Sequence, residues 1–95
     1  MEDLDPLLTP PARLKLMTVL SGVSKIAFVT LGDGLGVSDS VLSKHLGALE
    51  DAGYVRRRKG VHGGRRTTWV AVTPRGRRAL SAHVTALRAL IDGID

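Results

Sequence analysis

One quarter of the chain carries nine basic side chains and no acidic one. Residues 54–78 have a formal charge of +9, whereas the rest of the 95-residue chain sums to −4, which gives the net charge of +5. Guanidinium and ammonium groups gathered in this way can hold the phosphates of a polyanion, although the same charges could form a solvated surface. Apolar residues such as Val55, Trp69 and Val72 interrupt the basic ones, so we expect a folded segment rather than a disordered tail.

A second polar set precedes this block, in a segment that begins at Ser38. At about 100° per residue, one side of a helix collects Leu42, His45, Leu46, Leu49 and Ala52, and the other side collects Ser40, Ser43, Lys44 and Gly47. Ser38 is placed to cap this helix, and Asp39 suits the positive end of its dipole. We expect a helix over about 38–52 with one apolar side and one polar side.

Three glycines at alternate positions, Gly32, Gly34 and Gly36, come just before that helix. They could form a phosphate-binding loop at a helix N-terminus, as in nucleotide-binding enzymes, or the turn of a helix-turn-helix. No strand of the buried parallel type precedes them, and the chain has no room for a second βαβ unit. We therefore favour the turn, with Gly36 ending the preceding helix, and we have no explanation for Gly32 and Gly34.

Several kinds of chemistry are not supported by the residue types present. The absence of cysteine excludes disulfides, thiolate metal sites and cysteine nucleophiles. The histidines, at 45, 62 and 83, lack ligand spacing, and no grouping of Ser, His and Asp suggests a catalytic triad. No apolar run is long enough to span a bilayer, and the N-terminus lacks a signal-peptide pattern. We expect a cytoplasmic protein that is not an enzyme and that has no metal, cofactor or membrane partner.

The elements that must position the polar sets follow from start and stop signals. Thr9, Pro10 and Pro11 begin a first helix that Gly22 ends, and a second helix is expected over residues 26–35. YVRRRK and TTWVAVT predict two strands, with GVHGGRR as a flexible loop, in a hairpin over about 54–73. A last helix is expected over about 74–92. The predicted fold class is α+β, mainly helical, in a single domain of residues 1–95.

The last helix has apolar residues at alternating spacings of four and three, which is a seam of the coiled-coil type. Alanines widen the apolar surface, so we expect one stripe to pack on its own domain and another on a second copy. A deeply buried helix of a monomer is the alternative. The predicted dimer contacts are Leu4, Leu7, Leu8, Leu80, Val84, Leu87, Ile91 and Ile94.

Two segments, GVSDSVLSKHLGALEDAGYV and RTTWVAVTPRGRRAL, contain four motifs in order. These are a small-Ser turn at 36–38, a leucine-spaced helix at 42–49, a Leu-Glu-x-Ala-Gly-Tyr-Val exit at 49–55 and a Thr-Pro-x-Gly helix start within 72–76. In this arrangement the chain resembles winged helix-turn-helix transcriptional regulators, close to the MarR-like group and especially its short single-domain members. The resemblance covers nearly the whole chain.

This resemblance implies a sequence-specific regulator that binds double-stranded DNA, expected to be a homodimeric repressor with a long dimerisation helix at its C-terminus. The recognition helix, over about 38–52, would enter the major groove, and the hairpin, or wing, would lie at the minor groove. Lys44 could reach a guanine or a phosphate, and both readings stay open. The expected DNA contacts are Ser38, Asp39, Ser40, Ser43, Lys44, Arg58, Lys59, His62, Arg65 and Arg66.

The alternative function is that of a nucleoid-associated or RNA-binding protein, which would bind nucleic acid through the same basic hairpin without sequence specificity. In either case binding should weaken steeply as salt is added, because each neutralised phosphate releases counterions. A small-molecule effector is left open, since no residue set identifies its site.

Overall fold

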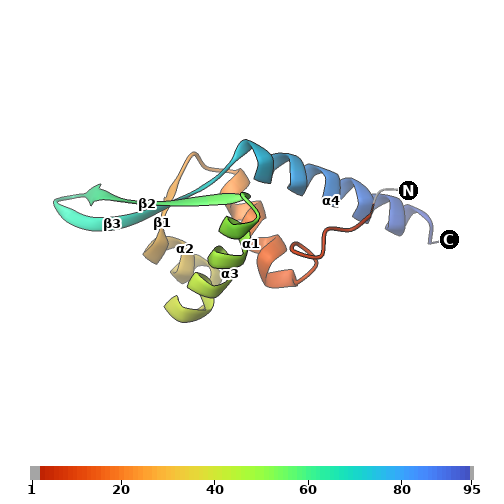
Figure 1. Ribbon diagram of the computed structural model, residues 1–95. Coiled ribbons are helices and arrows are strands. Elements are labelled where there is room, and N and C mark those ends of the chain that lie inside the picture. Colours follow the sequence, from red (N-terminus) through yellow and green to blue (C-terminus); the bar gives the residue numbers. More distant parts are fainter. Residues whose placement is uncertain (1–2, 95) are drawn as a thin grey trace.

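A computed structural model describes residues 3–94 as four helices and a three-stranded antiparallel sheet (Figure 1). In chain order these are helix α1 (Pro11–Ser21), strand β1 (Ile26–Ala27), helix α2 (Phe28–Leu35), helix α3 (Asp39–Asp51), strand β2 (Val55–His62), strand β3 (Arg65–Val72) and helix α4 (Pro74–Asp92). Helices α1, α2 and α3 form the body, and the β2–β3 hairpin and α4 extend from it in opposite directions. The predicted class, α+β and mainly helical, is confirmed; residues 1, 2 and 95 of the predicted domain lie outside the described residues.

Strand β1 was not predicted from the sequence. Ile26 and Ala27 pair with Val70 and Trp69 of β3, so the strand order is β1-β3-β2. The second helix therefore begins at Phe28 and not, as expected, at residue 26. Pairing with β3 gives the backbone of β1 hydrogen-bond partners and covers an edge of β3 that would otherwise be open. A strand of two residues has no periodicity, and its partner is distant in the chain.

The core lies where α1, α2 and α3 meet the base of the sheet. The leucines predicted to face inward from α3 are buried, and His45 and Ala52 on the same side are half-buried. The cluster of buried residues consists of Leu8, Leu16, Met17, Leu20, Leu31, Leu42, Leu46, Leu49, Val55, Val70, Val72 and Leu80. Burial of this apolar face fixes which side of α3 is left in solvent.

Of the three glycines before α3, Gly36 forms the turn of a helix-turn-helix, and Gly32 and Gly34 lie within α2. Gly36 ends α2 in the left-handed conformation, with φ 67°, and the Ser38 Oγ accepts a hydrogen bond from the backbone N–H of Val41 at 3.3 Å, which caps α3. Gly32 is buried, and a Cβ built on it would lie 3.3 Å from a methyl group of Leu42. Its lack of a side chain lets α2 approach α3 closely. Nothing in the structure explains Gly34, which is exposed with no atom near its would-be Cβ.

The hairpin loop is much tighter than the sequence suggested. The strands run through to His62 and start again at Arg65, which leaves only Gly63 and Gly64 in the turn, with φ of 58° and 77°. Two glycines adopt these positive φ values without a steric penalty and match the twist of the strands, so pairing continues up to the turn. The residues assigned to a flexible loop therefore lie on paired strands, and each points to one defined face of the sheet.

The base of the hairpin is locked to the start of α4. The Thr73 N–H donates to the Tyr54 carbonyl at 2.9 Å, and the Thr73 hydroxyl donates to the Gly53 carbonyl at 2.6 Å. The same hydroxyl caps α4 by accepting from the Gly76 N–H at 3.0 Å. A Cβ on Gly76 would lie 2.1 Å from the Tyr54 carbonyl oxygen, so the backbones touch here. These contacts explain physically why the Gly-Tyr and Thr-Pro-x-Gly motifs occur on either side of the hairpin.

Candidate nucleic-acid interface

The polar side of α3 forms the first part of the candidate interface. Asp39, Ser40, Ser43 and Lys44 are exposed, as predicted, and Gly47 is half-buried. Ser38, the helix cap, is also exposed, and its Oγ lies 3.3 Å from the Oγ of Ser40. Lys44 is the single Lys or Arg of α3. The side presents hydroxyl groups around one cation, which suits hydrogen bonding to base edges and phosphates.

Arg57 connects this helix to the hairpin. Its Nε donates to Glu50 Oε1 at 2.6 Å, its Nη2 forms an ion pair with the same oxygen, and its Nη1 donates to Ser43 Oγ at 3.1 Å. The Glu50 charge is therefore neutralised at the edge of the interface, and the Ser43 hydroxyl, predicted to contact DNA, also has a partner within the chain. Sequence reasoning missed this pair, because the exit motif at 49–55 contains Glu50 but ends before Arg57 and does not say that the two side chains meet.

The register of the hairpin divides its side chains between two faces. Val55, Arg57 and Lys59 of β2 pair with Val72, Val70 and Thr68 of β3, and Val61 pairs with Arg66. Because the valines at the base are buried in the core and Arg57 reaches α3, this whole face lies on the α3 side. We call it the inner face.

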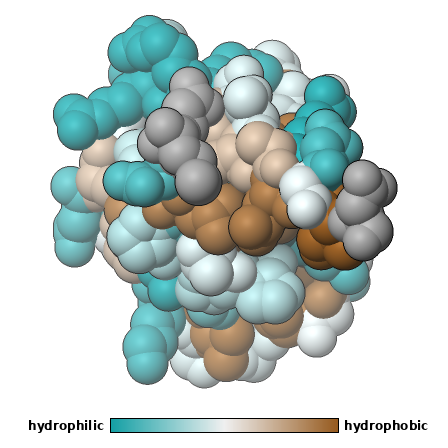
Figure 2. Space-filling model, turned by 90° about the vertical axis from the view of Figure 1, so that its right-hand side faces the viewer, coloured by the Kyte–Doolittle hydropathy of each residue, from teal (hydrophilic) through white to brown (hydrophobic). Residues whose placement is uncertain are grey.

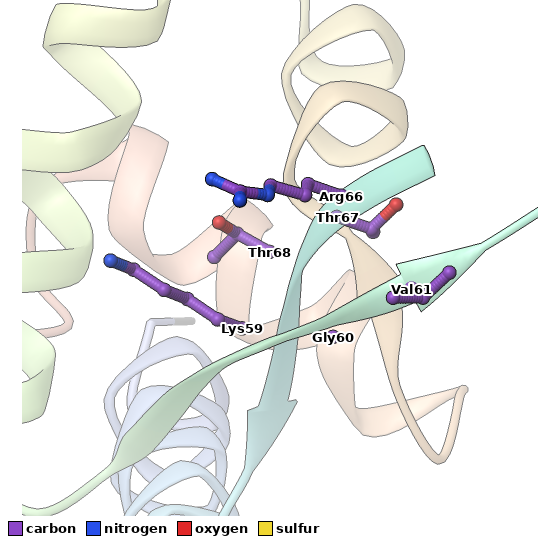
Figure 3. Close-up of a pocket in the computed structure, with 6 residues that line it drawn as sticks. All are labelled: Lys59, Gly60, Val61, Arg66, Thr67 and Thr68. Atoms are coloured by element: carbon purple, nitrogen blue, oxygen red, sulfur yellow. The ribbon is translucent and has the colours of Figure 1, made fainter. Parts of the chain in front are cut away.

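Two of the predicted contacts, Lys59 and Arg66, lie on the inner face. Figure 3 shows their side chains and that of Thr68 pointing to the same side, toward α3, and away from Thr67. Together with neighbouring strand residues they line a hollow of about 470 Å³. The polar side of α3, the Arg57 bridge and these two cations form one surface with an excess of positive charge.

The other predicted hairpin contacts, Arg58, His62 and Arg65, lie on the opposite face, which we call the outer face. Trp69 is at the centre of this face, half-buried, with the Lys25 Nζ 4.3 Å from its ring centroid and the His62 ring edge-on at 5.4 Å. The structure thus divides the predicted hairpin contacts between two faces. Alternation within YVRRRK already puts Arg58 and Lys59 on opposite faces, but the sides taken by His62, Arg65 and Arg66 follow only once these residues are known to lie on paired strands.

The predicted dimer contacts are divided as well. Leu8 is fully buried and Leu80 is 9% exposed, and both belong to the core of this chain. The prediction that they contact a second copy is therefore wrong. Leu4, Leu7, Val84 and Leu87 are half-buried. The core takes the first half of α4, because that half packs against α1, whereas the second half extends beyond the body.

The end of α4 carries an exposed apolar patch, formed by Leu90, Ile91 and Ile94 at 57%, 61% and 75% exposure. Figure 2 looks at this end of the molecule and shows hydrophobic side chains gathered beside the two termini. A hollow of about 790 Å³ lies next to them, between α4 and Leu4 of the N-terminal segment. Here the structure leaves apolar surface in solvent that sequence reasoning had assigned to a partner copy.

The N-terminal segment is held to both the hairpin and α4 by Asp5, a role that the sequence did not reveal. Asp5 Oδ2 accepts from the Tyr54 hydroxyl at 2.6 Å, and the Asp5 N–H donates to Nδ1 of the buried His83 at 2.9 Å. The hydrogen bond to the Asp5 carboxylate, with burial and the negative charge of Asp5, raises the pKa of Tyr54 above its ordinary value. His83 is therefore a structural residue of the segment's anchor.

Among residues 3–94 no three His, Cys, Asp or Glu side chains are grouped so that they could hold a metal ion. None of the helices in this range is both long enough and apolar enough to cross a membrane.

The chain is similar to known proteins in both sequence and structure. A family model described as a winged helix DNA-binding domain matches residues 12–91. An uncharacterised protein of Methanocaldococcus jannaschii is 31% identical over 83 residues, which cover 87% of this chain and 90% of that protein. The structure of a transcriptional regulator homologue from Pyrococcus horikoshii is similar, with a TM-score of 0.87, 31% identity, and coverage of 94% of this chain and 88% of that one.

A transcriptional regulator of the MarR family from Silicibacter pomeroyi is similar too, with a TM-score of 0.69 and 30% identity. The match covers 94% of this chain and 62% of that one, so the chain spans about three fifths of the longer regulator.

Proposed function

The chain belongs to the family of winged helix DNA-binding domains, and from this premise we propose that it regulates transcription by binding specific sites on double-stranded DNA. The predicted resemblance to MarR-like regulators is confirmed. The observation that carries the proposal is the single surface made by the polar side of α3 and the inner face of the hairpin, joined through Arg57. In this arrangement α3 lies in the major groove, with Ser40, Ser43 and Lys44 toward the base edges.

The wing contacts the backbone beside that groove. Lys59 and Arg66 lie on the α3 side of the sheet, so they can meet phosphates of the duplex that α3 occupies. The Gly63–Gly64 turn has no side chain to obstruct approach, and it brings the tip of the hairpin to the minor groove. The expected contacts at Ser38, Asp39, Ser40, Ser43 and Lys44 belong to the same proposal.

We further propose that two copies associate through the patch of Leu90, Ile91 and Ile94. A small domain that leaves three large apolar side chains together in solvent gains stability by covering them. Two copies would present their α3 helices to half-sites about 34 Å apart on one face of the duplex. We also propose that the dimer is a repressor, which blocks transcription where its site overlaps a promoter, and that it acts in the nucleoid.

The test is selection of bound duplexes from a random pool, with the mass of the complex measured alongside. We expect enrichment of a sequence with dyad symmetry and two protein chains per duplex. Enrichment without symmetry would contradict the dimer, and tight binding without any enrichment would favour the nucleoid-associated alternative.

A further inference from the structure

The outer face of the hairpin carries its own basic surface, away from α3. Lys25, Arg56 and Arg58 are exposed and help to line a hollow of about 420 Å³ that also includes Trp69 and Ala71. Lys59, at the border between the two faces, lines both this hollow and the inner one. No residue lining this hollow is acidic. His62 and Arg65 continue the same face toward the tip of the hairpin.

Arg56 and Arg58 point away from the surface that α3 and the inner face form. Arg56 pairs with Ala71 and Arg58 with Trp69, on the side of the sheet opposite to the buried Val55 and Val70. Lys25 joins them, because its Nζ lies 4.3 Å from the ring centroid of Trp69 on the same face. The sheet therefore separates these three cations from Arg66 and the polar side of α3, and each surface can face a different polyanion.

The chemistry of the outer face suits phosphate rather than stacked bases. Base stacking needs an open aromatic ring, but Trp69 is half-buried, has the Lys25 ammonium 4.3 Å from its centroid and meets the His62 ring edge-on. The ring also packs against the backbone at Gly60, where a Cβ would lie 2.9 Å from it. Trp69 thus holds Lys25 beside the two arginines, and three cations in an open hollow can follow a phosphate backbone.

We propose that the outer face binds the phosphate backbone of a second DNA duplex, so that the protein bridges two duplex segments. The inference rests on the proposed function, because that function makes DNA the polyanion at hand. Recognition on this face is by charge and is independent of sequence, since phosphate contacts carry no base information.

The test is a capture assay with two duplexes. A first duplex, fixed to beads, is loaded with protein and washed, and a labelled duplex of random sequence is then added and its retention measured. The outer-face variant combines Lys25→Gln, Arg56→Gln and Arg58→Gln. All three side chains are exposed, so the fold should be retained, and thermal unfolding checks this. The control, or inner-face variant, combines Lys59→Gln and Arg66→Gln, and because Lys59 also borders the outer hollow, Arg66→Gln alone is measured beside it.

We expect the outer-face variant to lose capture of the second duplex by about tenfold or more and to bind the first within about twofold of wild type. The inner-face variant should instead lose affinity for the first duplex. The inference is overturned if the outer-face variant still captures, or if wild type captures single-stranded DNA as well as duplex. It is equally overturned if the outer-face variant loses the first duplex in parallel, since its cations would then serve that duplex.

The two proposals fail in different ways. Wild-type protein that does not bind the first duplex contradicts the proposed function and this inference with it. Wild-type protein that binds the first duplex normally and captures no second one contradicts only this inference.

Discussion

Gly76 and Tyr54, at the base of the hairpin, make contacts that the sequence motifs around them do not specify. The backbone of α4 touches the Tyr54 carbonyl at Gly76, and the Tyr54 side chain anchors Asp5. The motif identified a helix start, but the contact that makes glycine necessary there comes from residues on the far side of the hairpin. The structure thus explains why glycine stands at position 76 and tyrosine at position 54, whereas the sequence showed only that these residues belong to motifs.

Substitution of Gly76 by alanine should destabilise the protein severely. The added Cβ would lie 2.1 Å from the Tyr54 carbonyl oxygen, and a backbone atom cannot move aside as a flexible side chain can. Overpacking of this kind costs about 1–3 kcal/mol or more, measured by urea unfolding. The matched control is Gly34→Ala, where no atom lies within 4 Å of the new Cβ. That variant should gain up to about 1 kcal/mol from helix propensity, and an equal loss in both variants would contradict the assigned contact.

The Tyr54–Asp5 hydrogen bond should make stability depend on pH in the alkaline range. The pKa of Tyr54 is raised in the folded protein, so the neutral hydroxyl is the form that folding favours. Its contribution is complete below the pKa of an unfolded tyrosine, about 10, and is lost as the pH rises through the folded value. Tyr54→Phe should therefore cost about 1 kcal/mol at neutral pH. The difference between the two proteins should shrink above about pH 10, and a constant difference would contradict this account.

At the scale of elements, the sequence predicted what periodicity and end signals determine. Four features could be predicted because each depends on neighbours within a few residues. These are the inward leucines of α3, its Ser38 cap, the Gly36 turn and the start of α4. Strand β1 was not predicted, because its two residues depend on pairing with the distant β3. The tight turn has a local signal in Gly63 and Gly64, but the residues on either side of this pair do not show how far strand pairing continues. The site was affected in the same way: the residue types were identified, but their division between two faces needed the register.

The Arg57–Glu50 pair should couple α3 to the hairpin. Each side chain is about one third exposed, at 28% and 30%, so solvent screens the pair and its coupling energy should be about 0.5 kcal/mol. A double-mutant cycle of Arg57→Ala and Glu50→Ala by urea unfolding measures it. We also expect Arg57→Ala to weaken DNA binding although its guanidinium is already paired, because Ser43 and Glu50 of α3 lose their common partner on the hairpin. If Arg57→Ala binds DNA with unchanged affinity, Arg57 does not position α3 relative to the hairpin.

For the whole molecule, charge determines how binding responds to salt. The inner-face variant, Lys59→Gln with Arg66→Gln, should reduce the slope of log affinity against log salt by about 1.8, because each phosphate contact contributes about 0.9. Titration of one duplex at several salt concentrations gives the slope. A variant with the wild-type slope would show that these two cations face solvent in the complex.

The last prediction concerns assembly, and it depends on the shape of the whole chain. Leu90, Ile91 and Ile94 lie at the end of α4 farthest from the hairpin, so a second copy docked there leaves both α3 helices free to face one duplex. Replacing all three by serine should produce a monomer by sedimentation and keep the core intact, because these side chains are already exposed. The matched control is Val29→Ser, an exposed apolar residue of α2 that should leave the dimer unchanged.

The monomer should bind a two-half-site duplex more weakly than wild type, since it loses the gain from simultaneous engagement, and bind a single half-site equally well. A triple variant that still sediments as a dimer would place the contact elsewhere, and Leu4 or Leu87 would then be the next positions to change.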